Sequence, residues 1–234
     1  MFNYEKLIAV LDQPPMIIGL AGAGGKTSTM FALGKHYANL GFRVVLTTTT
    51  KILKPTFEQM DRLEVGLSAK PINISQGEIL ALGAAIGEDG KLVGFDPSTL
   101  DAWDASAYDV LIYEADGAKC KAIKAPREDE PRIATSTTHV IGCIGLDVVG
   151  KIFDEKTVHR IKEFEKITGC LVGEKLNVEH MKTLVIHQNG LFQNTSESMK
   201  KICLLTKADD HERIEEAKSI MLRLNHWQGT VLWI

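Results

Sequence analysis

The chain has 234 residues, of which 44% are hydrophobic, so it is long enough to form one domain with a sizeable buried core. Its formal charge of −3 at pH 7 argues against a nucleic-acid-binding protein that depends on a broad basic surface. Four widely separated cysteines without a C-x-x-C, no signal peptide and no apolar run of membrane-spanning length predict a cytoplasmic protein with no membrane partner.

The first predicted unit consists of a strand, a glycine-rich turn, a helix and a second strand. Residues 15–22 (PMIIGLAG) are apolar throughout, which is typical of a buried strand in a parallel sheet. Apolar residues then recur at spacings of three and four from Met30 to Leu40, and Gly41 follows as a natural helix end. Residues 43–50 (RVVLTTTT) are typical of a second strand. Together they predict a βαβ unit with parallel strands.

The rest of the chain continues the alternation of strands and helices. Glycine-rich residues 52–107 predict an insertion with short strands and a hairpin turn at residues 87–91. The remaining expected elements are strands within 108–119 and 139–147, a helix over 154–167, a strand over 201–210, a helix over 211–226 and a strand over 230–234. We therefore predict an α/β fold: one three-layer domain over residues 1–234, with a mostly parallel sheet and a small β-rich insertion after its second strand.

The turn after the first strand has the sequence GAGGKT, residues 22–27, and is followed by a serine. Backbone N–H groups at a helix start can wrap an anion, glycines let the main chain approach it, a lysine reaches the outer phosphates and a hydroxyl binds Mg²⁺. The residues expected to hold a nucleotide's phosphates are Gly22, Ala23, Gly24, Gly25, Lys26, Thr27 and Ser28. The usual P-loop spacing would need a glycine at Leu20, so this is a shorter G-x-x-G-K-T form, the spacing of Mur-type ligases.

Two carboxylates follow the strand VLIYEADG, at Glu114 and Asp116. Mg²⁺ prefers hard oxygen ligands, so these acids and Thr27 are the expected metal site, and one acid could instead orient an attacking water. Lys26, Glu114 and Asp116 are the predicted catalytic residues. Hydroxyls at the end of the second strand, Thr48 and Thr49, are expected near the γ-phosphate, although threonines also suit a strand for its own sake.

A late strand ends in TKAD, residues 206–209, which resembles the N-K-x-D base-reading motif of GTPases. Asp209 would accept hydrogen bonds from two guanine nitrogens and the Lys207 stem would stack beneath the ring, which favours GTP over ATP. The D-x-x-G motif of a switch GTPase is missing after the acidic strand, so we do not expect an ordinary switch GTPase.

Two basic stretches have alternative interpretations. His159 and Arg160 are either a surface pair or placed at the nucleotide or substrate. Residues 119–131, rich in lysine and proline, form either a substrate or phosphate loop or an exposed connection.

The ordered set GAGGKT, TTTTKI, EADGAK, IKAP, GLD, VHR and TKAD resembles the YqeC family over nearly the whole chain. The resemblance implies a P-loop NTPase-like protein that is an accessory protein for selenium-dependent molybdenum hydroxylases. It also implies that residues 22–27 hold phosphates, that Glu114 and Asp116 serve the metal, and that residues 206–209 read the base.

The sequence leaves three functions open. The first is a Mg²⁺-dependent NTPase that uses ATP or GTP during maturation of a molybdenum hydroxylase, with that enzyme or its cofactor-maturation proteins as partners. The second is an ATP-dependent transferase or ligase that activates a small acid, as Mur-type enzymes do. The third is a nucleotide-binding module that releases no phosphate.

Overall fold

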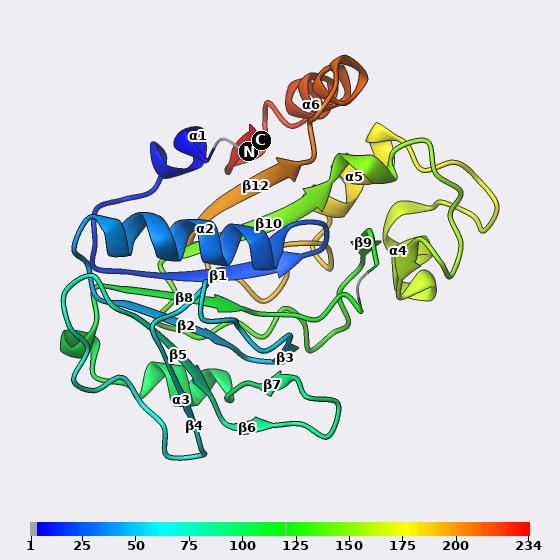
Figure 1. Ribbon diagram of the computed structural model, residues 1–234. Coiled ribbons are helices and arrows are strands. Elements are labelled where there is room, and N and C mark those ends of the chain that lie inside the picture. Colours follow the sequence, from blue (N-terminus) through cyan, green and yellow to red (C-terminus); the bar gives the residue numbers. More distant parts are fainter. Residues whose placement is uncertain (1–3, 120) are drawn as a thin grey trace.

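An eight-stranded sheet forms the centre of the molecule, and each of its strands runs parallel to its neighbours (Figure 1). The computed structural model describes residues 4–119 and 121–234. In spatial order the strands are β13 (Thr230–Trp233), β12 (Lys200–Thr206), β10 (His139–Gly145), β1 (Met16–Gly22), β8 (Val110–Glu114), β2 (Val44–Thr48), β5 (Ile79–Gly83) and β4 (Arg62–Val65). The predicted α/β class with a mostly parallel sheet is therefore confirmed.

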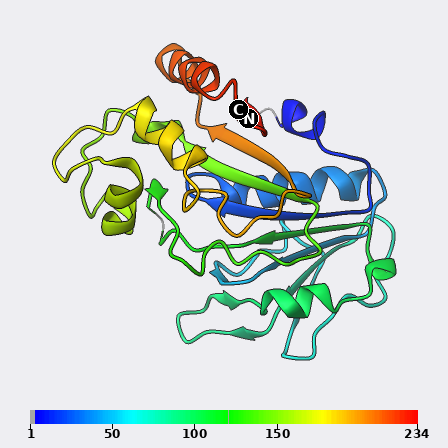
Figure 2. The same ribbon diagram turned by 180° about the vertical axis from the view of Figure 1, so that it is seen from behind.

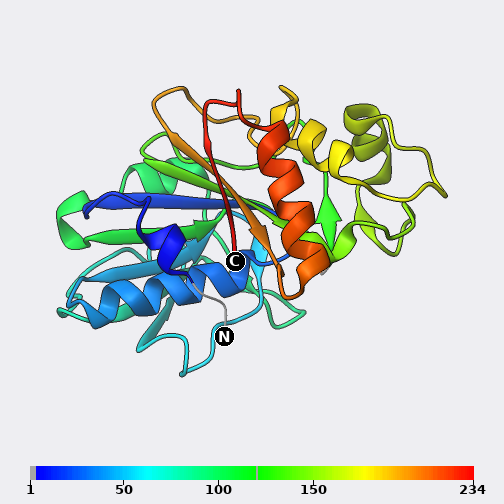
Figure 3. The same ribbon diagram turned by 90° about the horizontal axis from the view of Figure 1, so that it is seen from above.

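Helices cover both faces of this sheet, which gives three layers. On one face lie α1 (Glu5–Ile8) and α2 (Lys26–Asn39), and the opposite face carries α3 (Pro97–Asp101), α5 (Val178–Ile186) and α6 (His211–Arg223). Helix α4 (Ile161–Thr168) packs against α5. Figure 2 shows α3 and α5 on the side away from α2, and Figure 3 shows α6 beside β13. Two 3₁₀ turns, η1 (Ala105–Ala107) and η2 (Leu146–Val148), complete the helical elements.

The layers follow from strand alternation. Every residue of β1 is buried, and successive side chains point to opposite faces. Ile18 packs in the same core as Met30 and Leu33 of α2, whereas Ile17 packs in the core beneath α3. The apolar residues that predicted this helix are buried against the sheet as far as Tyr37, whereas Leu40, just after the helix end, is exposed.

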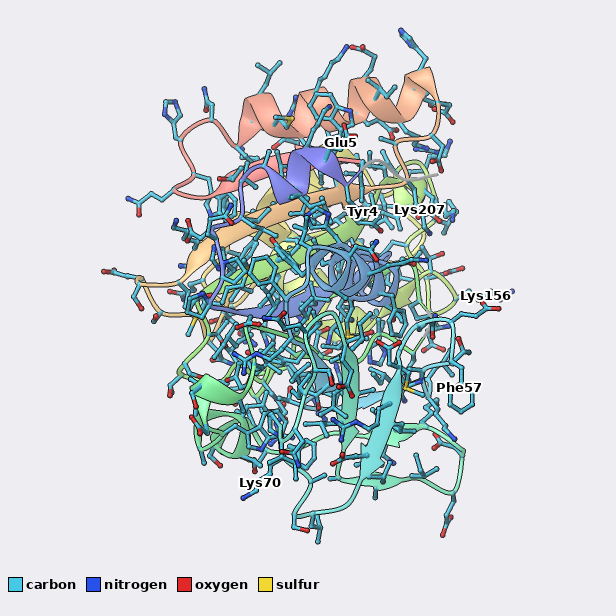
Figure 4. All side chains as sticks on the ribbon, turned by 60° about the vertical axis from the view of Figure 1, so that its left-hand side comes forward. Tyr4, Glu5, Phe57, Lys70, Lys156 and Lys207 are labelled. Atoms are coloured by element: carbon cyan, nitrogen blue, oxygen red, sulfur yellow. The ribbon has the colours of Figure 1, made fainter. Side chains whose placement is uncertain are left out.

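The segment 52–107 does contain short strands, but two of them, β4 and β5, extend the main sheet. The others form a small antiparallel sheet of β3 (Lys51–Ile52), β7 (Leu92–Val93) and β6 (Ala85–Ile86). The expected hairpin turn is present, because the Gly87 amide donates to the Lys91 carbonyl over 2.8 Å. Phe57 and Lys70 of this segment are labelled in Figure 4.

The helix expected over 154–167 begins only at Ile161, so that prediction was wrong in its first half. The Asp154 carboxylate accepts from the backbone amides of Lys156 and Thr157, which holds a turn there. The next two residues form β11 (Val158–His159), paired with β9 (Ile123–Lys124). A pairing with a distant segment therefore replaced the local helical preference.

Three of the cysteines, Cys143, Cys170 and Cys203, are buried free thiols, and Cys120 lies outside the described residues. Within the described ranges no helix has both the length and the apolar character needed to cross a bilayer.

Candidate functional site

The candidate site lies at the carboxyl edge of the sheet, where β1, β8, β10 and β12 end side by side. The register places Leu20 beside Glu114, Gly22 beside Cys143 and Gly145 beside Thr206. Strand β8 lies on one side of β1, and the next strand of the sheet along the chain, β10, lies on the other side. The order in which strands are added to the sheet therefore reverses at β1. Ligands of open α/β sheets bind at such a switch point. A cleft of about 1330 Å³ opens there and includes Ala23 to Ser28 in its lining.

The glycines of the loop are needed because the main chain passes very close to neighbouring strands. Gly22 has φ of +87° and a Cβ there would collide with the carbonyl oxygen of Cys143. Gly24 has φ of +80° and a Cβ there would lie 2.6 Å from the Gly145 amide nitrogen. The β10 backbone therefore fixes how sharply the loop curls.

The loop presents a run of backbone amides without acceptors. The Ala23 amide donates to the Cys143 carbonyl over 3.0 Å, but the amides of residues 24–28 make no hydrogen bond to the described part of the chain. Gly25 is the N-cap of α2 and provides no side-chain cap. Unsatisfied N–H groups at a helix start, together with the helix dipole, attract an anion.

Lys26 is buried beneath this loop and held by acids. Its Nζ donates to Asp116 Oδ1 over 2.7 Å and lies 3.9 Å from Glu114 Oε2. Burial alone would lower the pKa of Lys26, but the charges of Asp116 and Glu114 outweigh it, so the pKa is raised. The ammonium group is charged and has an anionic partner already in place.

Thr27 and Glu114 form a pair of oxygen donors at the mouth of the loop. The Thr27 hydroxyl donates to Glu114 Oε1 over 2.5 Å, and both residues line the cleft. Burial raises the pKa of Glu114, and Lys26 and the Thr27 hydroxyl lower it only in part. A cation bound beside this carboxylate would favour its charged form.

Asp116 is placed differently from Glu114. Its Oδ2 accepts from the Gly22 amide over 2.9 Å and lies 3.2 Å from Lys124 Nζ, while its Oδ1 holds Lys26. It is 1% exposed and is not part of the cleft lining. Both carboxylate oxygens are therefore engaged in orienting the loop and its lysine.

The threonines at the end of β2 are bonded to the backbone. The Thr48 hydroxyl donates to the Glu114 carbonyl and the Thr49 hydroxyl to the Arg132 carbonyl, each over 2.9 Å. Thr49 lines the cleft and Thr48 does not. The Thr48 hydroxyl therefore joins the end of β2 to β8, and the Thr49 hydroxyl joins it to the segment before β10.

The TKAD segment contacts the phosphate loop through its first residue. The Thr206 hydroxyl donates to the Gly24 carbonyl. Lys207, labelled in Figure 4 near Tyr4, has φ of +61°, lines the cleft and pairs with Asp147 over 2.9 Å. Asp209 follows in the turn before α6, is exposed and does not belong to the cleft lining.

Sequence reasoning missed Lys124 and Glu130. Lys124 is 1% exposed, and its Nζ bonds to Glu130 Oε2 over 2.7 Å as well as to Asp116. Arg160 Nη2 lies 3.2 Å from the other oxygen of this carboxylate, Glu130 Oε1. The lysine- and proline-rich composition of residues 119–131 was the available signal, but it did not reveal which residues are buried.

The donor set suits a small hard cation that completes its coordination with phosphate oxygens and water. Among the described residues no group of three or more His, Cys, Asp or Glu side chains could hold a metal by itself. Mg²⁺ is usually bound by one or two protein oxygens plus substrate phosphates. Thr27 and Glu114, next to the free amides, fit that pattern.

Two comparisons with known proteins identify similar sequences. A family model described as YqeC protein matches residues 18–162, which include the phosphate loop, both acids and Arg160. The "Uncharacterized protein YqeC" of Escherichia coli (strain K12) is 28% identical over 226 residues, covering 94% of this chain and 87% of that relative.

Proposed function

The chain belongs to the YqeC family, and from this premise we propose that it is a Mg²⁺-dependent NTPase that acts in the maturation of a selenium-dependent molybdenum hydroxylase. Nucleotide binding is supported above all by the backbone amides of residues 24–28, which make no hydrogen bond within the described residues, and by the buried Lys26 side chain in the same loop. The accessory role rests on the family resemblance.

Each residue of the loop side has a separate task in this proposal. The free amides bind the phosphate oxygens, and the charged Lys26 turns from Asp116 toward the outer phosphates. Asp116 keeps the loop curled through the Gly22 amide. Thr27 and Glu114 would hold Mg²⁺, which neutralises phosphate charge when bound. Glu114 is also the carboxylate that can reach a water in the cleft.

A Mur-ligase-like activation of a small acid is the second candidate, because the cleft extends well beyond the loop. It is about 1330 Å³ in volume and continues to Arg127 and Arg160. Small-molecule sites are commonly about 300–1,000 Å³. Room for a second reactant is what a ligase needs and a simple hydrolase does not.

The test is a titration of the purified protein with GTP and with ATP, with Mg²⁺ or with EDTA, while phosphate release is recorded. We expect Mg²⁺-dependent binding of GTP with slow phosphate release. Preferential ATP binding that releases phosphate only with an added acid would favour the ligase, and binding without release would favour the non-hydrolysing module. Binding of neither nucleotide would contradict all three.

The Lys26→Ala variant tests the loop assignment directly. Loss of charge-assisted contacts of about 1.5–3 kcal/mol should weaken nucleotide binding roughly 10- to 150-fold. Lys35→Ala, an exposed lysine on the same helix, is the matched control and should bind normally. Unchanged affinity in Lys26→Ala would show that the nucleotide binds elsewhere.

A further inference from the structure

Lysines and arginines gather at the end of the cleft formed by β9, β11 and the start of α4. Figure 1 shows β9 next to α4. Nine lysines and arginines line the whole cleft against five aspartates and glutamates, although the chain carries a net charge of −3. Five of these cations come from residues 119–160, and one of them, Arg132, pairs with Asp96 over 2.6 Å. We call the other four, Lys119, Lys121, Arg127 and Arg160, the cationic cluster. Lys119 and Lys121 have no carboxylate partner in the ranges that the structure describes.

Too few carboxylates lie beneath this cluster to balance it. The buried Glu130 carboxylate lies 2.7 Å from Lys124 Nζ, 3.2 Å from Arg160 Nη2 and 3.7 Å from Arg127 Nη2, and the exposed Asp129 also pairs with Arg127, over 3.2 Å. Lys124 in turn shares Asp116 with Lys26. The Nε of Arg160 is buried and lacks an acceptor among the described residues. A bound anion would supply the missing negative charge.

His159 lies in the same wall and reports its positive potential. Burial, Arg160 and Lys124 lower the pKa of His159 to about 4. Glu130 acts in the opposite direction, and Lys119 adds to the lowering. The imidazole is therefore neutral at pH 7, and a nearby anion would favour its protonated form.

The backbone holds Arg160 in a conformation that costs energy. Its φ is +69° and its ψ +65°, in the left-handed region that residues with a Cβ seldom adopt. Such conformations persist only where the surrounding structure fixes them, and they cluster at functional sites. Here β11 pairing on one side and α4 on the other fix the residue.

We propose that the cationic cluster is a second binding subsite of the cleft, which takes the carboxylate or phosphate group of a small acidic molecule beside the nucleotide. This inference rests on the proposed function only in calling that molecule a second reactant. The subsite is separate from the phosphate loop, because four successive ion pairs lie between Lys26 and Arg160, through Asp116, Lys124 and Glu130. In the proposed function, the loop amides and Lys26 bind the nucleotide phosphates, so the phosphates do not occupy the cationic cluster.

The test follows the His159 imidazole by NMR during titration with inorganic phosphate and, separately, with acetate. His159→Gln assigns the resonance among the seven histidines. We expect a saturable shift and a rise of the His159 pKa toward its ordinary value with at least one probe. A response to phosphate alone assigns the subsite to phosphate groups, and a response to acetate assigns it to carboxylates. No saturable response to either probe would overturn the proposal.

Variants distinguish this subsite from the loop. Lys26→Ala should keep the His159 response, and Arg160→Gln should weaken anion affinity at least about 10-fold. Arg43→Gln is the matched control, because Arg43 also pairs with a carboxylate, Asp109, but at the opposite edge of the sheet. Arg127→Gln changes a half-exposed residue, so the variant should fold normally, and it should reduce affinity less than Arg160→Gln.

The outcomes separate the two proposals. A response that is lost in Lys26→Ala and kept in Arg160→Gln would place the anion at the phosphate loop and overturn the subsite. If wild-type protein binds neither ATP nor GTP, but the His159 response is present in wild type and survives Lys26→Ala, the subsite is upheld and the proposed function is contradicted.

Discussion

The two sides of the cleft balance their charges in different ways. On the loop side, Lys26 lies between two carboxylates, Asp116 and Glu114, that come from the end of one regular strand and the turn after it. On the side of the cationic cluster, one buried carboxylate, Glu130, serves several cations that come from short, irregular segments. We therefore expect the structure of the loop side to be most sensitive to changes in its backbone, and that of the cluster side to be most sensitive to loss of charge.

Among these variants, we expect Gly22→Ala to cause the largest loss of stability. It tests how far the loop side depends on its backbone. The new Cβ adds left-handed strain and a collision with the Cys143 carbonyl, so the free energy of unfolding should fall by about 2–5 kcal/mol. Gly41→Ala is the matched control, since Gly41 has φ of +88° with nothing within 4 Å of a Cβ, and it should lose only about 1–2 kcal/mol. Urea unfolding measures both, and equal losses would show that the approach to β10 does not matter.

Glu130→Gln should show the dependence of the cluster side on charge. Burial raises the pKa of Glu130, but Lys124 and Arg160 outweigh it and hold the pKa at about 2, below its ordinary 4.5. The carboxylate therefore stabilises the folded state above pH 4.5, and this contribution is lost as the pH falls toward 2. We expect the variant to lose about 2–4 kcal/mol at pH 7.

The pH profile is the measurement that identifies this mechanism. The difference in unfolding free energy between wild type and Glu130→Gln should shrink steadily between pH 4.5 and 2. Glu128→Gln, an exposed neighbour two residues away, should match wild type throughout. A difference that stays constant with pH would point to lost packing instead of lost charge.

The same contrast explains which features the sequence could predict. The strand, turn and helix around residues 16–39 leave local signals in the sequence, and the apolar run, the glycines and the apolar spacing of the helix were enough to predict them. The nearness of Glu114 to Thr27 followed from parallel strands ending at one edge. The α/β class followed from the alternation of such units.

The cluster side could not be predicted in this way. Lys124 and Glu130 are six residues apart in a segment whose composition resembles a surface loop, and their burial depends on β9 pairing with β11. Because of that same pairing, the helix expected over 154–167 begins only at Ile161. Pairings between segments about 35 residues apart leave no periodic signal in either segment.

The smallest expected effect on stability comes from Asp209→Ala, which tests whether Asp209 reads the base. This residue follows β12, outside the two sides of the cleft compared above. Asp209 is exposed, so Asp209→Ala should leave the unfolding free energy within about 0.5 kcal/mol of wild type. If Asp209 accepts hydrogen bonds from guanine, GTP affinity should fall about 10-fold while ATP affinity is unchanged. Glu212→Ala, an exposed acid in the first turn of α6, is the control and should change neither. Competition binding with both nucleotides measures the ratio of the GTP and ATP affinities.

Equal affinities for both nucleotides in wild type and variant would contradict base reading by Asp209. The role of the TKAD segment would then be to shape the loop through the contact of Thr206 with Gly24.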